Sequence, residues 1–158
     1  MAKLTKGTEV YFLDPVGDVV TKLACPTNVT GLNAPKEQIP VSCLDSLEAE
    51  FLPGLAQPGP ASLTIQFDWT EPSHVRLYEM WQDPDIDIFP WAIGFSDDIG
   101  TPPTSGDSTG FVLPTTRSWL DFFASITDVP FDISLNSVYT SVITLQVSGA
   151  KTLTPATT

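Results

Sequence analysis

Few side chains in this 158-residue chain are of the types that carry out chemistry, and they lie far apart in the sequence. There is one histidine, His74, and no serine lies in a G-x-S-x-G sequence. A hydrolase that uses a nucleophile also needs a base within hydrogen-bond reach and a group that orients this base. His74 stands early in a helical segment beside Arg76 and Glu79, a setting typical of a surface or capping residue. The sequence therefore gives no support to nucleophilic catalysis.

The acidic run Asp83–Asp87 is similar to the opening of a calcium-binding loop. An EF-hand loop needs glycine at its sixth position and glutamate at its twelfth, where this chain has Ile88 and Gly94. A solvated acidic turn is therefore favoured. One histidine and two separated cysteines give no zinc pattern, and no glycine-rich phosphate loop with a lysine is present, so no metal or cofactor is expected. A glycosidase stays open, because 19 acidic residues always allow some carboxylate pair.

Composition excludes several classes of partner. The chain has 7 basic and 19 acidic residues, a net charge of −12 and a pI near 4.1, which disfavours a nucleic-acid reader and an anionic membrane surface. No segment approaches 18 apolar residues, and the first residues lack the apolar run of a signal peptide. The two cysteines, Cys25 and Cys43, are expected to be buried apolar thiols.

The elements that position these residues are mainly β-strands. Fifteen prolines and ten glycines divide the chain into short segments, most of which alternate apolar and polar residues. The expected strands cover 8–13, 63–69, 91–95, 118–126 and 137–148. One helix is expected from Pro72 to Gln82, with Leu77, Met80 and Trp81 on one face. The fold class predicted is mostly β, a two-sheet antiparallel β-sandwich or barrel with one short flanking α-helix.

Two long connections lie between these elements. Residues 96–110 are rich in Gly, Pro, Ser and Thr and are expected to form a mobile polar surface loop. Residues 44–60 contain five large apolar residues together with strong breakers at 53–54 and 58–60, and apolar residues on a loop must be buried somewhere. Two alternatives remain open: a helical turn at 45–51 packed on its own domain, or an arm that packs on a partner subunit.

Charge is distributed unevenly along the chain. From Glu37 to Asp132 there are 16 acidic and two basic residues, a net charge of −14. Acidic residues keep a β-protein soluble, and they also make a surface that does not hold a polyanion.

The order of turns and strands resembles a known family. The segment from Gly31 to Trp81 has a glycine turn, a strand that ends near VSC and a loop that opens with LDS. It continues with FLPGL, a PG turn, the strand LTIQFD and the helix from Pro72. With the opening KLTKGTEVYF and the ending SVITLQVSGAKTLTPA, this pattern resembles the tail tube (major tail) proteins of phages with long non-contractile tails. The resemblance covers most of the chain and is weakest over 83–117.

The resemblance implies one tail-tube domain over 1–158, with no enzyme activity and no cofactor. It implies hexameric rings that stack into a hollow tube, assembled in the host cytoplasm and located in the virion tail. The implied partners are the chain itself, a tape-measure protein, tail terminator and tail-tip proteins, and double-stranded DNA in transient passage. No membrane binding is expected.

Two sets of residues are candidates for assembly. The arm at 44–60 would supply anchors to a neighbouring subunit or ring through Leu44, Leu47, Phe51, Leu52 and Leu55. The polar sides of the later strands would line an acidic bore through Asp121, Asp128 and Asp132.

Two other functions remain open. A carbohydrate-binding β-sandwich would present tryptophans in a row as a stacking platform, and the candidates are Trp69, Trp81, Trp91 and Trp119. A type VI secretion tube protein is similar in fold, although the acidic balance and the 31–81 pattern favour the phage tail.

Overall fold

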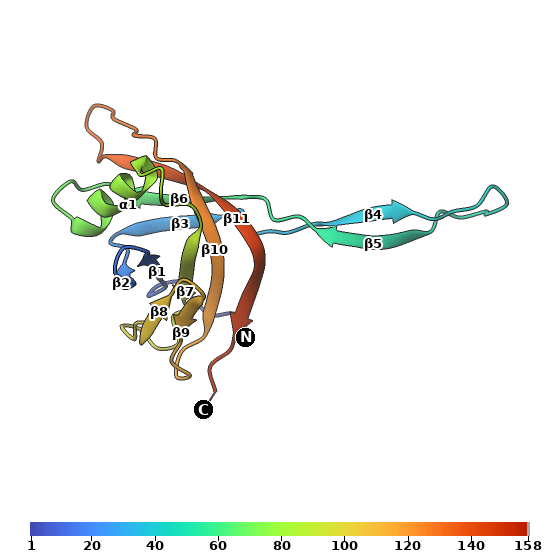
Figure 1. Ribbon diagram of the computed structural model, residues 1–158, viewed down its shortest axis with the longest axis horizontal. Helices are drawn as coiled ribbons and strands as arrows, with labels where there is room; N and C mark the ends of the chain where they lie inside the picture. The colour runs from blue at the N-terminus through green and yellow to red at the C-terminus, as the bar shows by residue number, and fades with distance from the viewer. Residues whose placement is uncertain (158) are drawn as a thin grey trace.

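The computed structural model describes residues 1–157, and its main body is an antiparallel sheet of seven strands (Figure 1). Their order across the sheet is β2-β1-β7-β10-β11-β6-β3. The bounds are β1 Glu9–Asp14, β2 Val19–Lys22, β3 Pro26–Thr30, β6 Pro60–Gln66, β7 Phe89–Gly94, β10 Trp119–Asp128 and β11 Thr140–Thr154. The predicted mostly β fold with antiparallel strands and one helix is confirmed.

The two layers expected of a sandwich belong to one continuous hydrogen-bonded sheet. Val10 of β1 and Leu63 of β6 lie near opposite ends of the strand order, yet both belong to one buried core with Ile143 of β11. The sheet must therefore curve around this core. Register shifts between Asp121 and Phe123 of β10, and again further along the β10–β11 pair, supply the bends that bulges introduce.

The alternating residues that predicted the strands divide between two faces. In β10, Phe122 and Ala124 enter the main core on the inner face, whereas Trp119 packs on the outer face with Tyr11 and Ala92. This part of the outer face is covered by the hairpin β8 (Ser105–Asp107) and β9 (Gly110–Val112). The rest of the outer face, over β6 and β11, has no such cover.

Helix α1 (Pro72–Gln82) packs its apolar side on the core. Proline in the first turn suits a helix start, because the N–H that it lacks has no partner there. Leu77 and Met80 are buried and Trp81 is partly buried, as the predicted helix face requires. Within the described residues, no helix has the length and apolar character needed to cross a membrane.

The segment 96–110, expected to be a mobile surface loop, is anchored to the body. It contains β8, its Pro103 is buried, and the carbonyl of Thr101 accepts a hydrogen bond of 2.9 Å from Arg117 Nη1. Most of its residues are exposed, as expected for a surface loop, but the composition of this segment gave no sign of these long-range contacts.

Candidate assembly surfaces

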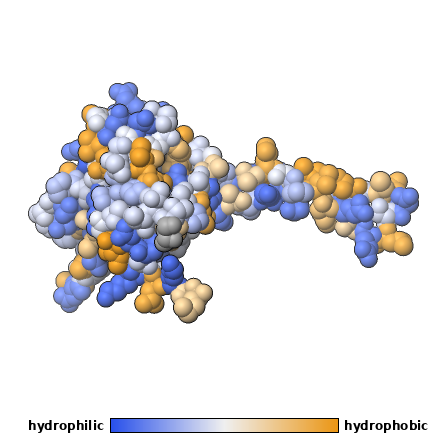
Figure 2. All heavy atoms as spheres, turned by 90° about the horizontal axis from the view of Figure 1, so that it is seen from below, coloured by the Kyte–Doolittle hydropathy of each residue, from blue (hydrophilic) through white to orange (hydrophobic). Residues whose placement is uncertain are grey.

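A long hairpin leaves the body between β3 and β6 and is called the arm (residues 33–59). Its strands are β4 (Lys36–Pro40) and β5 (Phe51–Ala56), paired antiparallel with Ile39 opposite Leu52. In Figure 1 the arm projects away from the sheet, and Figure 2 shows apolar residues along its length. Leu44 follows Pro35 by nine residues, so one extended side of the arm reaches about 30 Å at about 3.3 Å per residue.

Hydrogen bonds extend the arm beyond its two strands. The N–H of Val41 donates to the carbonyl of Glu50 over 2.9 Å, and the N–H of Glu50 donates to Ser42 Oγ over 2.7 Å. At the turn, the N–H of Cys43 donates to Ser46 Oγ over 3.1 Å. The helical turn considered for 45–51 is therefore wrong, because Phe51 begins a strand and the preceding residues form the extended tip.

The five predicted anchors are all exposed on the arm. Leu44 and Leu47 at the tip are 109% and 102% exposed, and Leu55 is 84% exposed. Phe51 and Leu52 are 55% and 56% exposed. An isolated two-stranded hairpin is at best marginally stable in water, and this one also presents a row of large apolar side chains. These two facts favour the second alternative, an arm that packs on another molecule.

Gly31 fixes the point at which the arm leaves the sheet. Its φ of +79° lies in the region that favours glycine, and a Cβ there would approach the carbonyl oxygen of Pro60 to 2.6 Å. Beyond it, Asn33 and Gly59 are joined by a hydrogen bond of 3.2 Å, which closes the base of the arm.

The three acidic residues predicted to line a bore share the outer face of the sheet. In the β10–β11 pair, Asp121 lies opposite Thr152 and Asp128 opposite Thr144. Asp132 forms an isolated bridge with Thr140, four residues before Thr144 and so on the same face. Asp121 is half-buried, and burial raises the pKa of its carboxyl, whereas the other two are exposed.

Between these acidic residues, the outer face of β6, β10 and β11 is lined mainly by hydroxyl and amide side chains and is called the polar face. Pro60, Phe123 and Val142 are its apolar members. Its polar residues, in addition to the three aspartates, are Ser62, Thr64, Gln66, Ser125, Thr140, Thr144, Gln146, Ser148 and Thr152. No lysine or arginine is among these paired outer residues, so the polar face offers a phosphate group no cation.

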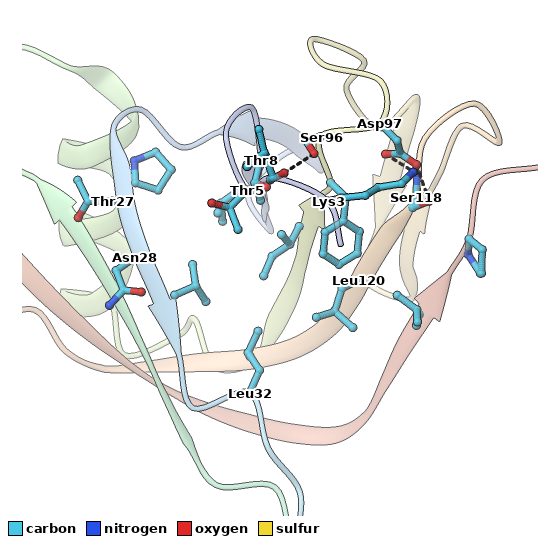
Figure 3. A pocket seen from close by; sticks show the side chains of 18 residues that line it. Lys3, Thr5, Thr8, Thr27, Asn28, Leu32, Ser96, Asp97, Ser118 and Leu120 are labelled. Atoms are coloured by element: carbon cyan, nitrogen blue, oxygen red, sulfur yellow. Dashed lines mark hydrogen bonds between the residues drawn. The ribbon is translucent and has the colours of Figure 1, made fainter. Parts of the chain in front are cut away.

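A pocket of about 740 Å³ opens on the inner side of the curved sheet and is called the N-terminal pocket. The buried residues Val10 and Ile93 are part of its lining. Leu120 and Leu32, which lies next to the base of the arm, also line it (Figure 3). At the mouth, Leu4 and Leu153 are 82% and 62% exposed. The lining is mostly apolar, so an apolar occupant fits it better than a charged one.

A buried ion pair joins β1 to the residues that precede β10. Arg117, fully buried, donates from Nη1 to Glu9 Oε2 over 2.5 Å and from Nη2 to the carbonyl of Gly94 over 2.9 Å. Burial opposes ionisation of Glu9, but hydrogen bonds from Lys22 and Arg117 outweigh it and lower its pKa to about 2. Burial, together with the hydrogen bond that its hydroxyl donates to Glu9, raises the pKa of Tyr11 to about 12.

The sequence interpretation missed this cluster. The one feature of the sequence that could have indicated it is that Arg117 is the only basic residue between Arg76 and Asp132, a segment with many acidic residues. The two partners of the ion pair are 108 positions apart, so no local pattern links them.

Other single residues differ from expectation. His74 is 1% exposed: the N–H of Asp68 donates to its Nδ1 over 3.0 Å, and its Nε2 lies 2.6 Å from the carbonyl oxygen of Ala24. It ties α1 to the strand ends, so the surface or capping role was wrong. Cys25 and Cys43 are exposed free thiols, not buried ones, because they lie in a turn before β3 and at the tip of the arm.

The tryptophans do not form a stacking platform. Trp91 and Trp119 are fully buried, Trp81 is partly buried and donates to the carbonyl of Thr127, and Trp69 is 63% exposed. Within residues 1–157, no three His, Cys, Asp or Glu side chains converge on a metal position.

Comparison with known proteins identifies the class as phage tail tube. A family model described as phage tail tube, TTP, lambda-like, matches residues 1–157. "Structural protein 3" of Pseudomonas phage PAJU2 is 36% identical over 156 residues, which cover 97% of this chain and 94% of that protein. The chain therefore belongs to the lambda-like phage tail tube family and is a virion structural protein, which favours the phage tail over a type VI secretion tube.

Solved structures agree in fold at low sequence identity. The SPP1 tail tube has a TM-score of 0.64 at 9% identity, covering 96% of this chain and 78% of that one. The tail of an empty GTA particle, refined with C6 symmetry, has a TM-score of 0.64 at 16% identity, covering 97% and 99%. The tube terminating cap of the anti-feeding prophage has a TM-score of 0.71 at 14% identity, covering 99% and 93%.

Proposed function

We propose that six copies of this chain form a ring, that the rings stack into a hollow tube, and that double-stranded DNA passes through it. The observation that carries the proposal is the tail tube family match over residues 1–157. The C6 symmetry of the similar GTA tail supports the ring number. Two surfaces of the structure support it, the arm with its exposed apolar residues and the polar face, whose paired residues include no lysine or arginine.

The edges of the sheet supply a reason for ring formation. Strands β2 and β3 end the strand order, and an open edge is a template for pairing with another chain. Because the two edges differ, contacts between them would be heterologous, and heterologous contacts close into rings when the rotation permits. Each copy carries −12, so apolar burial must outweigh repulsion between copies.

The polar face is proposed to line the channel, with Asp121, Asp128 and Asp132 as its acidic members. Fields from these carboxylates reach about 8 Å at physiological salt, so they act close to the wall. DNA binding depends on cations that neutralise phosphates, and none of the paired residues of the polar face is a lysine or arginine. The lining would therefore let DNA slide without holding it.

The proposed partners follow from the position of such a tube in a virion. A tape-measure protein would occupy the channel during assembly in the host cytoplasm, and terminator and tail-tip proteins would close its two ends. The likeness to a tube terminating cap supports the idea that the same fold caps such tubes.

A concentration series of the purified chain, followed by light scattering and negative-stain electron microscopy, tests ring formation. Rings or hollow tubes with six-fold averages are expected. A monomer at every concentration would contradict assembly by this chain alone.

The lining has a separate test in phage particles that carry Asp121→Lys, Asp128→Lys and Asp132→Lys together. Intact tails with slower DNA ejection are expected, because lysines would hold phosphates. Unchanged ejection kinetics would overturn the lining.

A further inference from the structure

We propose that a pocket beside the start of α1 binds a polyamine, a flexible alkyl chain that carries two or more ammonium groups. The pocket has a volume of about 430 Å³ and is called the aromatic pocket. It lies between the end of β6, the first turn of α1 and the residues that lead into β11, at the end of β6 that is remote from the arm (Figure 1). Since all of its residues belong to one copy, the inference goes beyond the proposed function and does not depend on assembly.

Two aromatic side chains form an exposed corner of this pocket. Trp69 and Tyr139 are 63% and 42% exposed, and their ring centroids lie 5.1 Å apart with the ring planes at 74°. Among the ring pairs of residues 1–157, this is the one pair in which both members are exposed. Ring faces attract cations and also pack against alkyl carbon, so such a corner suits an alkylammonium group.

Two carboxylates line the same pocket, and no lysine or arginine is among its lining residues. Asp68 Oδ1 accepts hydrogen bonds from the N–H and the hydroxyl of Thr70, over 2.8 Å and 2.7 Å. These bonds lower the pKa of Asp68, so its carboxyl is ionised at neutral pH. Glu71 is partly buried, and its side chain makes no capping hydrogen bond to α1 and takes part in none of the ion pairs of residues 1–157. The pocket therefore holds negative charge that no cation of the chain compensates.

The basic groups of the surrounding elements do not neutralise these carboxylates. Arg76, further along α1, pairs with Asp14 and Glu79. His74 lines the pocket and is 1% exposed, and its Nδ1 accepts a hydrogen bond from the N–H of Asp68, so the ring is in a neutral form. A cation is therefore the occupant whose charge complements the pocket.

A polyamine uses both kinds of surface. Its methylene groups would cover the rings of Trp69 and Tyr139, while its ammonium groups would pair with Asp68 and Glu71. A metal ion would use the carboxylates alone, and within residues 1–157 no three metal-binding side chains converge. A single ammonium group would pair with only one of the two carboxylates. The two together favour a ligand with at least two positive charges.

Fluorescence titration of the purified chain with spermidine at constant ionic strength tests the site, because Trp69 is the most exposed of the four tryptophans. A saturable change in emission is expected. Spermidine should bind about fivefold more tightly than Nα-acetyl-lysine methylamide, which offers one ammonium group, as a lysine side chain of a partner protein would. Equal affinities would overturn the assignment of a polyamine. An equal response to Mg²⁺, or no saturable response, would overturn the site.

Two substitutions separate the pocket from general attraction to an acidic protein. Glu71→Gln and Tyr139→Leu should each weaken spermidine binding about two- to fivefold, and about tenfold together. The matched controls are Glu48→Gln and Phe51→Leu on the arm, which remove the same charge and the same kind of ring from exposed positions outside the pocket. These controls should leave the affinity unchanged, and circular dichroism during heating checks that every variant is folded.

Two results would contradict the proposal. An equal loss of affinity in Glu71→Gln and Glu48→Gln would show that spermidine is attracted to the acidic surface as a whole. A fluorescence response that survives Trp69→Phe would place spermidine beside another tryptophan. The proposal predicts instead that Trp69→Phe abolishes the response, while calorimetry still detects binding to the pocket.

Discussion

Replacing the two leucines at the tip of the arm separates assembly from folding. We expect Leu44→Ser with Leu47→Ser to leave the folded monomer unchanged, because both side chains are fully exposed in it. Substitutions at exposed positions without special contacts change the free energy of unfolding by about 0.5 kcal/mol or less. In the assembled state the same side chains would be buried. Truncating each of them would then remove about 1.5–3 kcal/mol of the free energy that its burial contributes to assembly.

The two losses together amount to about 3–6 kcal/mol for each subunit added. Because about 1.4 kcal/mol corresponds to a tenfold change in an equilibrium constant, the critical concentration should rise about 10²- to 10⁴-fold. Light scattering over a concentration series measures this quantity, and circular dichroism during heating checks the monomer.

Leu135→Ser is the matched control, since Leu135 is 93% exposed outside the arm. We expect it to change the critical concentration less than tenfold. An unchanged critical concentration in the tip variant would refute burial of the tip. A lower melting temperature of its monomer would refute the claim that the tip contributes nothing to folding.

Further predictions concern the body of the fold. Arg117→Met should lower the free energy of unfolding by about 3–5 kcal/mol, because Glu9 would lose its fully buried partner and keep only the exposed Lys22; denaturant titration checks this. Arg76→Met, at a more exposed pair with Asp14, should cost about 1 kcal/mol, and equal losses in the two variants would contradict the reasoning. The lowered pKa of Glu9 stabilises the fold above pH 4.5 by about 3 kcal/mol, a contribution lost as the pH falls to about 2, so Glu9→Gln should flatten the stability profile in that window. Trp69→Phe should remove most of the fluorescence that iodide quenches, and strong remaining quenching would show that the other tryptophans are accessible.

Elements that pack on the core could be predicted from local patterns. Val10 and Phe12, or Ile143 and Leu145, alternate with other residues because one side of each strand faces the core. Helix α1 carried both its proline start and its apolar spacing in the sequence. In these segments packing on the core explains both the spacing of apolar residues in the sequence and the burial of those residues in the structure.

The arm could be anticipated as an apolar connection but not as a hairpin. Its strands have no core beneath them, so nothing imposes alternation, and Pro53 with Gly54 was interpreted as a breaker. The pairing of Ile39 with Leu52 depends on backbone hydrogen bonds that composition does not encode.

The contacts made over long sequence distances were also beyond local patterns. Glu9, Arg117 and the carbonyl of Thr101 meet only once the sheet has formed. The same reason explains His74, whose two hydrogen-bonding partners come from separate segments, and the single curved sheet, whose curvature depends on bulges in β10 and β11. Family resemblance, by contrast, depended on the order of turns and strands, which the sequence does show.

A helical reconstruction of the tube assembled from this chain by electron cryo-microscopy tests the central claim most directly. The account predicts six copies in each ring, the polar face of β6, β10 and β11 toward the channel, and each arm tip covered by another copy. A channel lined by a different face, or arms that stay exposed to solvent along the tube, would contradict it.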